Sequence, residues 1–185
     1  MKIAFFDLET KYLYQDLGID RKNGDPSKLK VAVAGVLLDG EHRMFREEEV
    51  LSLIAFLKEV DLIVGHNVLR FDYKVLQAYT SENLMDLFIQ KTFDTLQELE
   101  KVTGKWLGLD DLAKRNLGMS KNAETILIPK MWRDGKCDEV ISYLKNDLDM
   151  TKAVYEHGCN VGKFKYDHKD YGVSKGEREV SVRWG

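Results

Sequence analysis

The longest apolar run of the chain, residues 31–38, constrains the fold more than any other segment. It is far shorter than the roughly 18 apolar residues of a membrane-spanning helix, and it favours a buried strand. An Asp-Gly pair at 39–40 follows directly, and this dipeptide is typical of a two-residue hairpin turn. We therefore expect a strand at residues 29–38 to be followed by another at residues 42–45.

The remaining segments complete an α/β pattern. We expect further strands at 2–8, 62–65 and 88–93, and helices at 47–58, 71–79, 95–102, 109–117 and 138–156, the last ending at Gly158. Three strands followed by alternating helices and strands predict a mixed sheet flanked by helices. We assign this domain to residues 1–160.

The tail, residues 161–185, differs in character and is expected to belong to the same domain. From residue 163 it is polar and carries six Lys or Arg residues against four acids. Three interpretations stay open: a hairpin that completes the sheet, a flap that contacts substrate, or a partly disordered end.

Bulk properties exclude several classes of protein. A length of 185 residues suits one domain with a sizeable core. Cys137 and Cys159 are isolated, which argues against structural zinc and a disulfide framework. The net charge of −3 weakens a role in coating DNA, although a nuclease can hold phosphate through metals. The start lacks a signal-peptide layout, so we expect a cytoplasmic protein without membrane contact.

Four acidic residues lie in three short frames that suit metal binding. Asp7 and Glu9 are two apart at the end of the first strand, so their carboxylates point to one side. Asp72 falls in the first turn of its helix, where the helix dipole favours a carboxylate. Tyr143 and Asp147 are four apart and share a helix face. Each frame alone is also typical of an ordinary strand end or helix surface.

Four neighbouring carboxylates would repel one another unless cations compensate their charge. Mg²⁺ and Mn²⁺ prefer such oxygen ligands. A pair of these ions about 3.5–4 Å apart is the clamp used for phosphoryl displacement. A tyrosine hydroxyl beside the pair can orient a water without adding charge.

The order of the motifs resembles that of a known family. Asp-x-Glu-Thr at 7–10, Asn-x₃-Phe-Asp at 67–72 and Tyr-x₃-Asp at 143–147 follow the order of the DEDD (DnaQ-like) 3′–5′ exonucleases, tyrosine subtype. Residues 93–96 and 109–118 are also similar to the exonuclease domains of family-B polymerases and to stand-alone relatives of the YprB type. The resemblance covers about residues 2–158 and implies a ribonuclease H-like fold.

The resemblance also implies residue roles. Asp7 would bridge two Mg²⁺ or Mn²⁺ ions, Glu9 and Asp147 would complete the site of the water-activating ion, and Asp72 would serve the second ion. Tyr143 would orient the attacking water. The activity would be hydrolysis of single-stranded DNA or RNA from the 3′ end, releasing nucleoside 5′-monophosphates.

Substrate contacts are the next expectation. By the resemblance, Thr10 and Asn67 would lie near the terminal nucleotide or support the site. Tyr12 could stack on a base or pin its loop to the core, and both interpretations stay open. Asp94 follows a strand and could either support the site or cap a helix, and the cap is the simpler interpretation. Lys121 is a candidate for a phosphate contact.

Two alternative functions remain. One is a structure-specific endonuclease on the same fold, and the other is a non-catalytic module that binds nucleic acid or protein. The choice between DNA and RNA, the protein partners and the oligomeric state are left open by the sequence.

Overall fold

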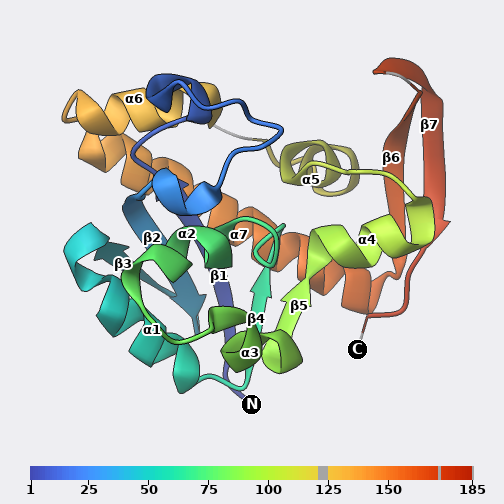
Figure 1. The fold of residues 1–185 in the computed structure, drawn as a ribbon. Coiled ribbons are helices and arrows are strands. Elements are labelled where there is room, and N and C mark those ends of the chain that lie inside the picture. Colours follow the sequence, from blue (N-terminus) through green and yellow to red (C-terminus); the bar gives the residue numbers. More distant parts are fainter. Residues whose placement is uncertain (121–124, 171, 185) are drawn as a thin grey trace.

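The computed structural model describes residues 1–185 apart from 121–124, 171 and 185 (Figure 1). Its central sheet has the strand order β3-β2-β1-β4-β5. The strands are β1 (Ile3–Thr10), β2 (Val31–Leu38), β3 (Glu41–Arg46), β4 (Leu62–Gly65) and β5 (Thr92–Asp94). β1, β2 and β3 pair antiparallel, whereas β4 and β5 run parallel to β1. The predicted α/β class with a mixed sheet is therefore confirmed.

Helices cover both faces of this sheet. They are α1 (Val50–Lys58), α2 (Asp72–Leu76), α3 (Leu84–Phe88), α4 (Thr95–Thr103), α5 (Leu109–Leu117), α6 (Ile128–Arg133) and α7 (Cys137–Asn160). Short 3₁₀ turns lie at Tyr14–Leu17, Pro26–Lys28, Glu47–Glu49, Gln77–Tyr79, Ile89–Lys91 and Thr125–Leu127. In Figure 1, α7 crosses behind the sheet, and α1, α2 and α3 lie in front of it.

The alternation of side chains along β1 separates two cores. Phe6 belongs to the buried cluster that β1 shares with α1 and α2. Phe5 points to the other face and packs with Leu144 and Leu148 of α7. Because residues two apart on a strand share a face, Asp7 and Glu9 continue the row of Phe5 on the α7 side.

A glycine in β2 allows α7 to lie close to the sheet. Gly35 is the register partner of Asp7. A Cβ atom at this position would lie 2.7 Å from Leu148 Cδ1 and 3.1 Å from Leu144 Cδ2. The bare backbone of Gly35 therefore leaves room for the helix that carries Asp147.

The hairpin turn between β2 and β3 is also as predicted. Asp39 and Gly40 both have positive φ, 52° and 82°, as a type I′ turn requires. The strands on either side pair in continuous register from Val33 with Arg46 to Leu38 with Glu41.

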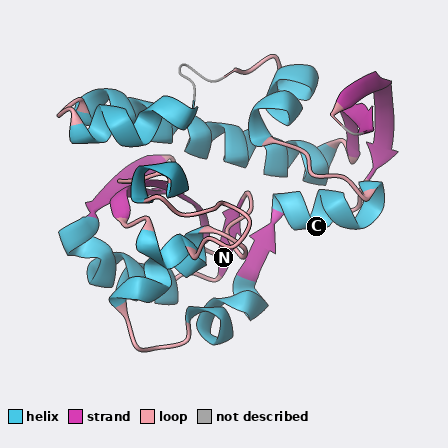
Figure 2. Cartoon of the chain, turned by 45° about the horizontal axis from the view of Figure 1, so that its top comes forward, coloured by secondary structure: helices cyan, strands magenta, loops and turns pink. Residues whose placement is uncertain are grey.

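The tail forms a hairpin of its own, β6 (Lys163–Asp170) with β7 (Val173–Ser181). It is a separate two-stranded sheet, so the interpretation that it completes the central sheet is wrong (Figure 2). Phe164 of β6 is fully buried in a third core with Leu112 of α5 and Val154 of α7. The hairpin thus covers the end of the molecule where α5 meets α7.

Two expected elements are placed differently in the structure. The strand expected at 88–93 is only β5, because α3 and a 3₁₀ turn occupy the residues before it. Asn83 caps α3 by accepting hydrogen bonds from the N–H groups of Met85 and Asp86. Leu84 and Phe88, four residues apart, then bury one helical face.

The end of the last helix is the second difference. α7 continues past Gly158 to Asn160, and the left-handed glycine that follows is Gly162, with φ of 69°. A Cβ atom on Gly158 would lie 1.8 Å from Trp184 Cε3. Gly158 therefore permits close packing of Trp184 on the helix, and it does not terminate the helix.

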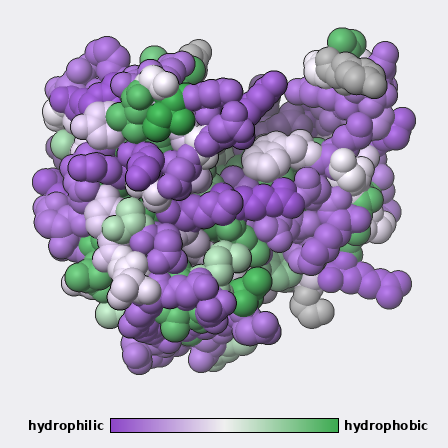
Figure 3. Space-filling model, viewed as in Figure 1, coloured by the Kyte–Doolittle hydropathy of each residue, from purple (hydrophilic) through white to green (hydrophobic). Residues whose placement is uncertain are grey.

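The surface is mixed in character. Hydrophilic residues cover most of the face seen in Figure 3, with separate apolar spots between them. Among the described residues, no helix is long and apolar enough to cross a membrane.

Candidate metal centre

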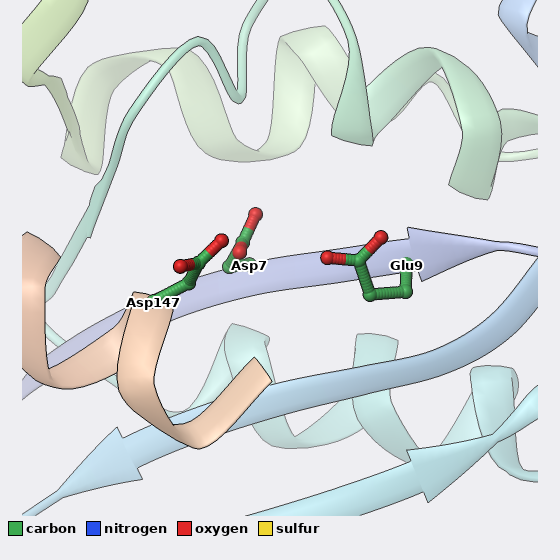
Figure 4. A group of neighbouring side chains, drawn as sticks. All are labelled: Asp7, Glu9 and Asp147. Atoms are coloured by element: carbon green, nitrogen blue, oxygen red, sulfur yellow. The ribbon is translucent and has the colours of Figure 1, made fainter. Parts of the chain in front are cut away.

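Three of the four predicted acids meet in space. Carboxylate oxygens of Asp7, Glu9 and Asp147 all lie within 4.8 Å of one another. Figure 4 shows Asp7 and Glu9 on one side of β1, with Asp147 of α7 beside Asp7. Glu9 and Asp147 are buried, at 8% and 3% exposure, and Asp7 is partly exposed.

The sheet topology explains why the site forms at this edge. β1, β4 and β5 are parallel, so their carboxyl ends lie at the same edge. Such an edge is where open α/β sheets bind ligands. Asp7 and Glu9 lie in the second half of β1, and Asp94 ends β5.

Asp72 lies next to this trio but outside the group. Its Oδ1 accepts a hydrogen bond of 3.1 Å from the N–H of Leu8, between the two acids of β1. Burial raises the pKa of the Asp72 carboxyl well above its ordinary value, and the negative charge of Asp7 raises this pKa further. A cation close to Asp72 and Asp7 would offset both effects.

Asp94 holds the loop between β4 and α2. Its Oδ1 accepts from the N–H of Asn67 at 2.9 Å, and its Oδ2 from the N–H of Leu69 at 3.1 Å. Oδ1 also accepts from the N–H groups of Leu96 and Gln97, which is the predicted helix cap. One buried carboxylate therefore fixes both the start of α4 and the loop that leads to Asp72.

Asn67 occupies a special backbone position in that loop. Its φ is 73°, in the left-handed region that asparagine tolerates better than most residues. Its buried Oδ1 has no hydrogen-bond partner among the described residues. The side chain therefore offers a free acceptor beside the strand ends.

His66 connects this loop to the segment between α4 and α5. Its Nδ1 lies 2.9 Å from Thr95 Oγ1, and its Nε2 lies 2.9 Å from the carbonyl oxygen of Leu107. The ring is thus engaged on both sides by groups of the fold.

Tyr143 is one turn before Asp147 on α7, as expected. It is 2% exposed and belongs to the cluster between α7 and the sheet, with Phe5 and Leu144. Tyr143 and Asp147 are thus both buried between α7 and its neighbours.

Thr10 and Tyr12, the two candidates for substrate contacts that remain, lie within three residues after Glu9. The Thr10 hydroxyl donates to the carbonyl of Tyr12 at 3.0 Å and so shapes the start of the loop. The guanidinium carbon of Arg133 lies 5.3 Å from the ring centre of Tyr12. Arg133 also donates to the carbonyl oxygen of Lys11 and to Asp16 Oδ2, so α6 holds this loop. Lys121 lies outside the described residues.

Sequence reasoning missed the role of Gly35 and left the role of Asp94 open between two interpretations. Gly35 lies within an apolar strand, where a lone glycine is a signal of close backbone approach. Asp94 caps α4 and also supports the site, and this second role depends on a loop 25 to 27 residues earlier in the chain. Only its position at the end of a strand could have indicated that role.

The chain shares its fold with one part of a known polymerase. It superposes on the family B DNA polymerase from the hyperthermophilic archaeon Pyrobaculum calidifontis with a TM-score of 0.63 and 17% sequence identity. The match covers 85% of this chain but only 24% of the polymerase chain. The five-stranded mixed sheet flanked by helices is thus a ribonuclease H-like fold. No protein-family model and no curated protein matches the chain.

The residues at the site fit a hard divalent cation. All three side chains of the trio supply carboxylate oxygens, the ligands that Mg²⁺ and Mn²⁺ prefer. Neighbouring negative charges would otherwise oppose one another's ionisation. The trio can therefore hold a metal ion.

Proposed function

We propose that this protein is a metal-dependent 3′–5′ exonuclease that hydrolyses DNA or RNA from a single-stranded 3′ end. The observation that carries the proposal is the meeting of Asp7, Glu9 and Asp147 at the carboxyl edge of a ribonuclease H-like sheet. The shared fold with a DNA polymerase supports a role with nucleic acid.

Each acid has a role in this proposal. Asp7 would contact two ions, Glu9 and Asp147 would hold the first, and Asp72 would serve the second. Bound Mg²⁺ or Mn²⁺ would lower the pKa of a water and neutralise charge on the phosphate. Three carboxylates within 4.8 Å supply the negative charge that such ions need.

Other side chains would position the reactants. The Tyr143 hydroxyl, one helical turn from Asp147, would orient the attacking water. The free Oδ1 of Asn67 would accept a hydrogen bond from the terminal nucleotide, while Thr10 and Tyr12 would shape the loop beside it. No covalent intermediate is needed, and nucleoside 5′-monophosphates are the products.

The test is a time course on 5′-labelled single-stranded DNA and RNA with Mg²⁺ or Mn²⁺. We expect a descending ladder from the wild type, and none when EDTA is added. Asp7→Asn should lower the rate by about a thousandfold or more, because metal charge stabilisation is worth several kcal/mol. Glu48→Gln, an equivalent change at an exposed residue, should leave the rate unchanged.

The outcomes separate the possible functions. Cleavage of circular single strands would indicate an endonuclease, because an exonuclease needs a free end. Wild-type activity in pure Asp7→Asn protein would contradict the site assignment. Mn²⁺ should also raise the melting temperature of the wild type but not of Asp7→Asn, since it binds the folded state. That rise without hydrolysis would indicate a binding module.

A further inference from the structure

A second surface feature lies beside the hairpin, away from the carboxylates. A hollow of about 240 Å³ separates the α4–α5 loop from β6. Its lining residues are Lys105, Trp106, Leu107, Gly108, Asp111, Asp167 and Lys169. The hollow therefore combines one large aromatic ring with charged groups of both signs.

Trp106 is unusual among the tryptophans of the chain. It is 59% exposed, whereas Trp184 is 6% exposed and packs in the third core with Phe164. Trp132 is half-buried, and the guanidinium carbon of Arg46 lies 5.9 Å from its ring centre. The core thus uses one tryptophan and a cation covers another, while the Trp106 indole remains largely open to solvent.

The charges around Trp106 balance one another. Lys105 Nζ lies 3.0 Å from Asp170 Oδ1, and Lys169 Nζ lies 3.8 Å from Asp167 Oδ2. Asp111 Oδ1 lies 2.8 Å from Nε of Arg115 on the same helix. With two lysines and two aspartates in the lining, the hollow gives no net attraction to a phosphate.

This balance suits an uncharged nucleobase better than a phosphate. Aromatic side chains bind unpaired bases by stacking, whatever the base. Carboxylates accept hydrogen bonds from base amino groups, and lysines donate to the acceptor atoms of guanine. The open indole and the mixed charges provide all three kinds of contact.

The hollow is physically connected to the candidate metal centre. Leu107, next to Trp106, accepts a hydrogen bond from His66 Nε2 at its carbonyl oxygen. His66 directly precedes Asn67 and follows the carboxyl end of β4. The loop that carries the exposed indole is thus hydrogen-bonded to the loop that borders the candidate metal centre.

We propose that Trp106 stacks on an unpaired base of the nucleic-acid strand whose 3′ end lies at the carboxylates. The presence of a nucleic-acid strand rests on the proposed function, whereas the position of the stacking site follows from the hollow. The stacked base would lie on the 5′ side of the terminal nucleotide. A strand long enough to reach Trp106 would therefore be bound more tightly than a shorter one.

The test measures binding without turnover. Fluorescence anisotropy of 5′-labelled DNA and RNA 12-mers is recorded with Asp7→Asn protein in EDTA. Adding Trp106→Ala should raise Kd about tenfold, the weakening expected for one lost stacking contact. Trp106→Phe should keep Kd within about threefold, because phenylalanine also stacks. Val102→Ala, at an exposed apolar residue of α4, is the matched control and should leave Kd unchanged.

The outcomes are independent of the exonuclease assay. An unchanged Kd for both DNA and RNA in Trp106→Ala would overturn the stacking site, even if the ladder is seen. A raised Kd without any hydrolysis would support the stacking site while the proposed activity fails. Because the indole is mostly exposed, we expect wild type and Trp106→Ala to have the same melting temperature. Equal melting temperatures exclude unfolding as the cause of a raised Kd.

Discussion

Asp94 is expected to contribute more to stability than any ordinary helix cap, because its carboxylate serves two elements. It is 3% exposed and accepts four backbone hydrogen bonds, two from α4 and two from the loop after β4. Loss of the cap costs about 1 kcal/mol. Each loop N–H left without a partner costs about 1–3 kcal/mol. Since such terms are not fully additive, we expect Asp94→Ala to lower the free energy of unfolding by about 3–5 kcal/mol.

A milder change separates the contributions. Oδ1 of Asp94 accepts three of the four hydrogen bonds, and Oδ2 accepts only that of Leu69. An asparagine that keeps its oxygen at Oδ1 would retain those three. Asp94→Asn should therefore cost only about 1–2 kcal/mol.

The assay is urea unfolding followed by circular dichroism at neutral pH. Asn83→Ala is the matched control, because the Asn83 side chain caps α3 through two N–H groups and holds no distant loop in the part of the chain that the structure describes. It should cost about 1 kcal/mol. If Asp94→Ala costs no more than Asn83→Ala, the bonds to the Asn67 loop do not stabilise the fold and the reasoning is refuted.

Two further predictions concern Asp72 and Gly158. Because the pKa of Asp72 is raised in the folded state, the folded protein binds more protons, and its stability falls as pH rises from the unfolded pKa of about 3.9. In EDTA, Asp72→Asn should therefore be more stable than wild type at pH 7, with a difference that disappears near pH 4; urea unfolding at pH 4 to 8 would contradict this if the two curves stay parallel. Gly158→Ala should lower the free energy of unfolding by about 1–3 kcal/mol, since its methyl group would overlap Trp184. A gain of about 1 kcal/mol, the usual effect of alanine in a helix, would show that Trp184 does not pack there.

Local patterns were sufficient for much of the fold. Residues 109–117 form a helix with the predicted bounds, ended by Gly118 in the left-handed conformation. The Asp-Gly turn likewise determines the first hairpin, because two adjacent residues with positive φ favour few other structures. These features depend on contacts between near neighbours, which the sequence displays directly.

Features set by distant contacts were predicted poorly. Gly158 was predicted to end the last helix, yet it lies inside α7, where its missing side chain leaves room for Trp184, 26 residues later in the chain. Phe88 has the hydrophobicity of a strand residue, but it is buried as part of a helical face with Leu84. The role of Gly158 thus depends on a distant packing partner, whereas the Asn83 cap and the four-residue spacing of Leu84 and Phe88 are local signals that the strand prediction overlooked.

The candidate site shows the same division. The two-residue spacing of Asp7 and Glu9 determines that their carboxylates share one side of a strand. Only the tertiary structure brings Asp147 to them, because α7 must pack close to the sheet opposite Gly35. The raised pKa of Asp72 is likewise a consequence of burial and of Asp7 nearby, and both are properties of the folded chain alone. The spacing of residues along a strand or helix determines the direction in which their side chains point. The distance between side chains on different elements depends on how those elements pack.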